Sequence, residues 1–161
     1  MPAYYTVMPG ATQTTNATAN TENDSLFTAP GSLAQLIVRY IHLTGKAAAA
    51  TTLSGITARL KMYPTTASSG GTAITPQPEI PAYAAAKSSA GYSAAAVTSG
   101  TGTLVFFREL GCGVSGSDTW QASRDLDDAP QIQPSATKSF DMFVSSPSAS
   151  TPYGLDLGIA E

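Results

Sequence analysis

The chain has 161 residues, which is the length of one domain with its own core. Only 12% of its residues are charged and the net charge is −3, and the eight Lys and Arg residues are scattered, so no basic surface for nucleic acid is apparent. The single cysteine excludes an internal disulfide, and no apolar run approaches the roughly 20 residues of a membrane span. We therefore expect one domain, residues 1–161, that binds neither nucleic acid nor membrane.

Composition also bears on where the protein is made and on its response to pH. Residues 1–10 lack the pattern of a signal peptide, so we expect synthesis and folding in the cytosol. Few paired carboxylates are available for protonation, so we expect stability to depend weakly on pH and salt.

The first 45 residues contain one strong strand signal. Residues 1–10 hold the apolar piece "YYTVM", and the Thr- and Asn-rich residues 11–24 follow, so 1–24 is expected to be a partly extended N-terminal arm. In "SLAQLIVRYIHLTG", 32–45, apolar residues occupy both parities. This pattern predicts a central strand covered on both faces. A short helix is the alternative, but the β-branched residues favour a strand.

The middle of the chain alternates strand and turn signals. Residues 56–63 alternate apolar with polar side chains up to Pro64, and "SSGG" can turn tightly before "TAIT", so 55–75 is predicted to be a hairpin. Three prolines between 76 and 81 oppose regular sheet. The low-complexity segment 82–102 is predicted to be a surface loop, with one or two helical turns as the alternative.

Three further strands are expected in the last third, at 103–110, 138–146 and 153–161. The last strand should be paired, because an unpaired terminal strand would fray. About seven short strands with turn signals between them and no amphipathic helix predict an all-β fold. We expect an antiparallel β-sandwich or a small barrel with long irregular loops.

Candidate catalytic side chains are few. His42 is the only histidine, and a metal site needs several converging ligands, so we interpret His42 as a hydrogen-bonded structural residue. Cys112 in "GCG" would need His42 as its base, and a small buried residue is the simpler interpretation.

Acidic residues cluster twice, at Glu22 and Asp24 and again at Asp125, Asp127 and Asp128. The second cluster lacks the regularly spaced oxygens, glycine and terminal Glu of a calcium loop, so it is expected to be a solvated loop. The sequence therefore predicts no catalytic, cofactor-binding or metal-binding residues, no cofactor, and no enzyme.

Several aromatic residues suggest interaction surfaces instead. Tyr63, Phe143 and Tyr40 fall on strand faces expected to meet water, and either a covering layer or a subunit interface would explain them. A carbohydrate-binding module is an alternative function, in which the rings of three other residues would stack on sugars: Trp120, Tyr83 and Tyr92.

The order of motifs resembles the capsid decoration, or cement, proteins of tailed bacteriophages. The matching features are the polar N-terminal arm "NATANTEND", the strand "LAQLIVRYIHLTGKAAA", the strand "GITARLKMY", "GGTAITPQP", and a "GCG" turn after an aromatic strand. The likeness spans most of the chain, but residues 82–102 have no equivalent in it.

The resemblance implies a jelly-roll-like sandwich that forms a homotrimer. It implies binding to the major capsid protein on the outside of an assembled shell, after synthesis in the bacterial cytoplasm, and stabilisation of the contacts between capsomers. A head-fibre, tail or baseplate component of the same particle is a second expectation.

Overall fold

The computed structural model describes residues 2–32, 34–47 and 55–161. These residues form two antiparallel sheets and contain no helix, so none of them forms a helix able to span a membrane. The seven-stranded sheet consists of β1 (Tyr4–Val7), β2 (Gln13–Thr14), β4 (Leu36–Gly45), β7 (Gln77–Pro78), β10 (Ser117–Gln121), β11 (Gln131–Ile132) and β13 (Pro152–Ala160). The six-stranded sheet consists of β3 (Asn23–Ala29), β5 (Gly55–Tyr63), β6 (Ser69–Ile74), β8 (Ser89–Thr98), β9 (Val105–Gly113) and β12 (Ser139–Ser145).

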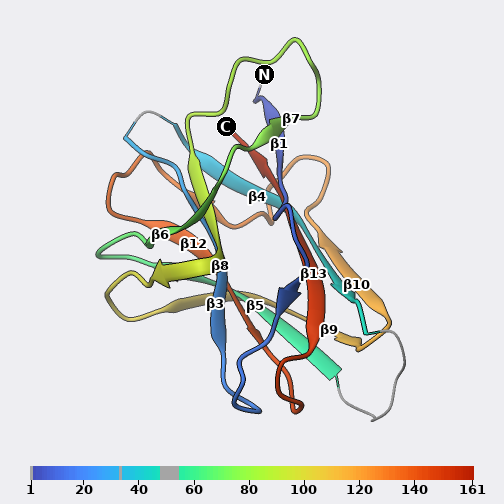
Figure 1. Cartoon of the computed structure of the whole chain (residues 1–161). Helices are drawn as coiled ribbons and strands as arrows, with labels where there is room; N and C mark the ends of the chain where they lie inside the picture. The colour runs from blue at the N-terminus through green and yellow to red at the C-terminus, as the bar shows by residue number, and fades with distance from the viewer. Residues whose placement is uncertain (1, 33, 48–54) are drawn as a thin grey trace.

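Eight of these strands have jelly-roll topology (Figure 1). One sheet contains the order β10-β4-β13-β1 and the other contains β3-β12-β5-β9, with every neighbouring pair antiparallel. Along these eight strands the chain crosses between the sheets at every step except β5–β9, which is how two Greek keys build a double-sheet jelly roll. The predicted β-sandwich is confirmed, and the barrel alternative is not adopted.

The core lies between the inner faces of the two sheets, where period-2 alternation places the apolar side chains. The predicted inward residues of three strands are buried, except that Met62 is only partly buried: Ile56, Ala58, Leu60 and Met62; Phe140, Met142 and Val144; Leu155, Leu157 and Ile159. The terminal strand β13 pairs with β4 on one side and with β1 on the other, so the prediction of a paired last strand is confirmed.

The prediction that β4 is covered on both faces is wrong, because a β-bulge shifts its parity. Val38 pairs with Ile159 but Tyr40 pairs with Gly158, so β4 has one extra residue at this point. The apolar residues Leu36, Val38, Ile41 and Leu43 therefore all face the core. Arg39 and Tyr40 are half-buried on the outer face of the sheet.

The predicted hairpin over 55–75 is also wrong. β5 is flanked by β12 and β9, so it has no free edge for β6, and β6 pairs with β8 instead. Gly70 and Gly71 have positive φ inside β6, where the register shifts, rather than in a turn between two strands.

The predicted surface loop 82–102 is correct only in part, because residues 89–98 form β8 between β3 and β6. Small side chains permit this close packing. A Cβ at Gly91 would lie 2.7 Å from the Phe27 ring. Before β8, residues 82–88 contain no strand.

Part of the expected N-terminal arm belongs to the sheet. β1 lies between β13 and β7, with Tyr5 and Val7 buried. The two chain ends are adjacent, because Ala3 and Glu161 exchange two backbone hydrogen bonds of 2.9 and 3.0 Å (Figure 1). The chain between β7 and β8 arches over them.

Candidate functional site

His42 is hydrogen-bonded through both ring nitrogens. Nδ1 lies 2.7 Å from the Thr119 hydroxyl and Nε2 lies 2.9 Å from the Thr44 hydroxyl. Asp156 lies opposite His42 on β13, and burial raises the pKa of this carboxyl although His42 and Lys46 oppose the shift. The interpretation of His42 as a hydrogen-bonded residue is confirmed, because each ring nitrogen has a hydroxyl partner.

Cys112 lies on β9 opposite Ile56, and its side chain packs at the margin of the core. Burial raises the pKa of the thiol, although a hydrogen bond from the Gly45 backbone works against this shift. A raised pKa reduces the thiolate fraction at neutral pH, which is the opposite of what a nucleophilic cysteine requires.

The acidic loop 125–128 contains no metal centre. Asp125 and Asp127 are exposed, and the Asp128 carboxylate accepts a 2.7 Å hydrogen bond from the Ser123 backbone, which lowers the pKa of Asp128. Within residues 2–32, 34–47 and 55–161, no group of three His, Cys, Asp or Glu side chains could hold a metal ion.

The three rings considered for carbohydrate binding do not form one platform. Tyr92 is buried in the core, Tyr83 packs against Tyr4 and Tyr5, and the Trp120 ring lies under the Arg108 guanidinium with 4.9 Å between cation and centroid. The three rings therefore do not share one stacking surface.

The outward aromatic residues of β5 and β12 are covered by the chain itself. Residues 64–68 and 98–102, which we call the cover, meet through the bridge between Thr66 and Thr101. Under the cover, Tyr63 and Phe143 are buried with ring centroids 6.1 Å apart. Tyr40, on the other sheet, donates to or accepts from the Thr6 hydroxyl at 3.0 Å. For Tyr63 and Phe143 the covering layer, rather than an interface, explains the pattern.

Beneath the cover lies a pair of carboxyl groups that sequence reasoning missed. Asp141 is fully buried, and its Oδ1 accepts a 2.5 Å hydrogen bond from Ser139, whose hydroxyl accepts from the Ser68 backbone. Asp24 is half-buried and its Oδ2 accepts from Ser99 at 2.8 Å. The cover therefore contributes Ser68 and Ser99 to this cluster.

The remaining oxygens of the two carboxyl groups, Asp24 Oδ1 and Asp141 Oδ2, are buried without a donor. Burial and then the charge of Asp24 raise the pKa of Asp141 to about 8, and burial raises the pKa of Asp24. Two close carboxyl groups cannot both ionise cheaply away from water, so we infer that the pair retains one proton near neutral pH. No pattern in the sequence indicates this pair, because Asp24 and Asp141 are 117 positions apart and meet only through β3–β12 pairing.

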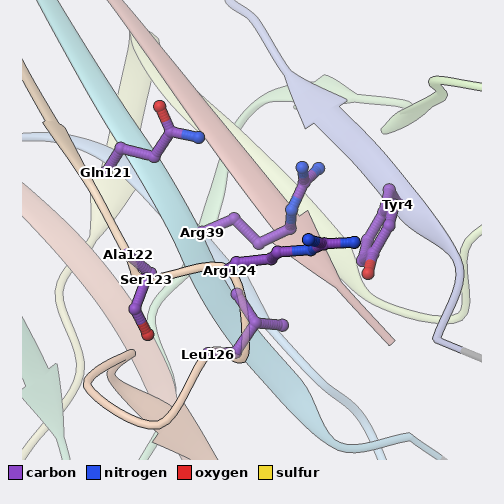
Figure 2. Close-up of a pocket in the computed structure, with 7 residues that line it drawn as sticks. All are labelled: Tyr4, Arg39, Gln121, Ala122, Ser123, Arg124 and Leu126. Carbon is purple, nitrogen blue, oxygen red and sulfur yellow. The ribbon is translucent and has the colours of Figure 1, made fainter.

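The outer face of the seven-stranded sheet contains a hollow of about 350 Å³. Arg39 on β4 and Arg124 in the chain after β10 both extend toward the Tyr4 ring (Figure 2). Gln121, Ser123 and Leu126 complete the lining together with Ala122. The Arg39 guanidinium lies 3.9 Å from the Tyr4 ring centroid and donates to Glu79 at 2.8 Å.

One edge of the sandwich carries exposed apolar side chains. β9 is the last strand of the six-stranded sheet and pairs only with β5 in the part of the chain that the structure describes. Val105 and Phe106 at its start are 40% and 56% exposed, while Phe107 turns inward and meets Phe140 edge to face.

The chain was compared with known protein families, with curated proteins and with solved structures, and none of the three comparisons found a match.

Proposed function

We propose that this chain is a structural protein of a phage virion, which binds the outside of an assembled capsid as a trimer and stabilises the contacts between capsomers. Two lines of support come together. The order of sequence motifs resembles capsid decoration proteins, and the jelly roll is a fold that virion proteins use. The argument from the fold is one of analogy, because one fold hosts many functions.

The observation that carries the proposal is the apolar start of β9. Exposed apolar residues on an open strand edge favour pairing with another chain, and soluble monomers usually protect such edges with charge, proline or a covering segment. Val105 and Phe106 are neither charged nor covered, although Arg108 and Glu109 follow on the same strand and the neighbouring Tyr63 and Phe143 are covered. We assign the β9 edge to contact between copies of the chain.

The distribution of polar chemistry agrees with a role that requires no turnover. His42 is held by two hydroxyls, the Cys112 thiol has a raised pKa, and Asp141 is closed off from solvent. A rigid sandwich presented three times on a symmetric surface would convert weak single contacts into firm attachment, because the second and third contacts form intramolecularly.

The test is to measure oligomeric state and shell binding of a β9 variant. Light scattering coupled to size exclusion should show a trimer for the native chain and a loss of trimer for Phe106→Ser. Co-sedimentation with purified, pre-assembled shells should show the same loss, since trivalent attachment depends on the trimer.

Met8→Ser is the matched control, because Met8 is also 56% exposed but lies beyond β1 of the other sheet. It should leave both measurements unchanged. A native chain that remains monomeric and does not sediment with shells would contradict the proposal.

A further inference from the structure

The hollow beside Tyr4 brings together more positive charge than the chain neutralises. Two guanidinium groups line it, and none of its lining residues is acidic. Arg39 forms an ion pair with Glu79, whereas Arg124 has no ion pair within the described residues. The nearby Asp128 carboxylate is bound to the Ser123 backbone. One guanidinium in the hollow is thus left without an anionic partner from its own chain.

Contacts within the protein also fix the shape of the hollow. The β-bulge turns Arg39 to the outer face, and Glu79 on one side and the Tyr4 ring on the other hold its guanidinium in place. The backbone of the segment that carries Arg124 is attached to the same strand, because the Ala122 N–H donates to the Arg39 carbonyl at 2.7 Å. The Arg39 guanidinium is therefore positioned before any ligand arrives, and the backbone near Arg124 is anchored beside it, which reduces the entropy lost on binding.

The lining selects a carboxylate that carries an apolar stem. Arginine presents a planar fork of N–H donors that matches a carboxylate, and Gln121 adds an amide. The Tyr4 ring and Leu126 supply apolar contact for methylene groups. The Arg39–Glu79 pair shows that one of these guanidinium groups already binds a glutamate side chain.

We propose that the hollow formed by Tyr4, Arg39 and Arg124 is a carboxylate-binding site, which receives an acidic side chain of the protein on which this module docks. The identity of the docking partner rests on the proposed function, whereas the carboxylate specificity does not. The residues of the site come from the seven-stranded sheet and the loop after β10, whereas β9 belongs to the other sheet, so contact between copies and docking would use different residues.

The site is tested on the isolated full chain by NMR titration, following the side-chain Nε–Hε resonances of the arginines. The probes are N-acetyl-glutamate N-methylamide, its neutral glutamine analogue, and inorganic phosphate. We expect the glutamate probe to shift the Arg39 and Arg124 resonances with a Kd on the order of millimolar, and the glutamine probe to have no effect. Arg124→Gln should weaken binding about tenfold, because one charge-assisted pair is lost.

Lys138→Gln is the control variant, since it removes the same charge from a lysine outside the hollow. It should bind as the native chain does. Arg39→Lys keeps the charge but removes the fork, and it should also weaken binding. Absence of shifts at tens of millimolar probe, or equal affinity in Arg124→Gln, would overturn the site. Tighter binding of phosphate than of the glutamate probe would overturn the carboxylate assignment.

The docking part is tested separately by co-sedimentation with shells. Arg124→Gln should remain trimeric and bind shells more weakly than Lys138→Gln. Equal shell binding by the two variants would overturn the docking role and leave the carboxylate site standing. Failure of the native chain itself to bind shells would refute the proposed function and the docking role together, while the titration result would be unaffected.

Discussion

Replacing Asp141 by asparagine should change how stability depends on pH. The folded protein holds the Asp141 carboxyl with a pKa of about 8, against an ordinary value of 3.8 for an aspartate side chain. Between these values the folded state binds a proton that the unfolded state has released. The free energy of unfolding must therefore fall as pH rises from about 4 to about 8, and it levels off above that range. An asparagine cannot ionise, so Asp141→Asn should lose most of this dependence.

The size of the effect follows from the burial of the group. Each unit of pKa difference corresponds to about 1.4 kcal/mol, so the interval from about pH 5 to about pH 8 carries at most on the order of 4 kcal/mol. The cover can move and admit water when Asp141 ionises, which lowers the penalty. We expect the native chain to lose about 2–3 kcal/mol over this interval, a large part of the stability of an ordinary domain.

Three ionisable groups next to Asp141 do not cancel the pH dependence expected from its raised pKa. The Asp24 carboxyl on β3 has a raised pKa of its own, and burial also raises the pKa of Tyr63 on β5. Lys61, which pairs with Asp141 across β5 and β12, binds Glu22 instead. The asparagine amide can donate to Asp24, so the variant keeps a hydrogen-bonded cluster under the cover.

The assay is urea unfolding at several pH values, followed by the fluorescence of Trp120, the only tryptophan. Native and Asp141→Asn proteins should have similar stability near pH 5, and the variant should be more stable near pH 8. The control is Asp127→Asn, because Asp127 is exposed, and this variant should show the same dependence of unfolding free energy on pH as the native chain. Parallel pH curves for the native chain and Asp141→Asn would refute the shared-proton reasoning.

Three further changes test the packing and the surface charges. Gly158→Ala should cost about 1–3 kcal/mol in thermal unfolding, because its Cβ would lie 2.0 Å from a Tyr40 ring carbon, whereas Gly113→Ala, with nothing within 4 Å, should be nearly neutral. Equal melting temperatures would mean that the Tyr40 ring moves aside freely. Phe140→Ala should cost about 3–5 kcal/mol, measured by urea unfolding, because a fully buried ring is removed, and a loss below about 1 kcal/mol would contradict this packing. Glu22→Gln should cost less than about 1 kcal/mol and only at low salt, because its ion pairs with Arg and Lys are partly exposed, and a cost that persists in high salt would contradict this assignment.

The local sequence pattern determined the strands and their inner faces wherever no β-bulge interrupts the alternation. The alternation in residues 56–63, 138–146 and 153–161 identifies three strands, and the same alternation tells which side chains face the core, although the outward Tyr63, Asp141 and Phe143 are buried as well. A strand with an apolar side chain at every second residue turns that face away from water, whichever strand it pairs with. The sequence alone therefore shows which face of the strand meets the core. The number of such strands predicts an all-β fold, and the strand pairing decides between a sandwich and a barrel.

Pairing between distant strands decided the rest. The bulge at Arg39 and Tyr40 exists because β13 pairs with β4 out of simple register, and it reverses the parity that the sequence suggested. The small residues of β8 form a strand because β3 and β6 flank them. The pH response expected to be weak is now expected to be marked, since Asp24 and Asp141 meet only when β12 joins β3 and the cover excludes water from Asp141. The closeness of the two carboxyl groups and the exclusion of water both arise from tertiary structure, and neither carboxyl group has an unusual pKa without them.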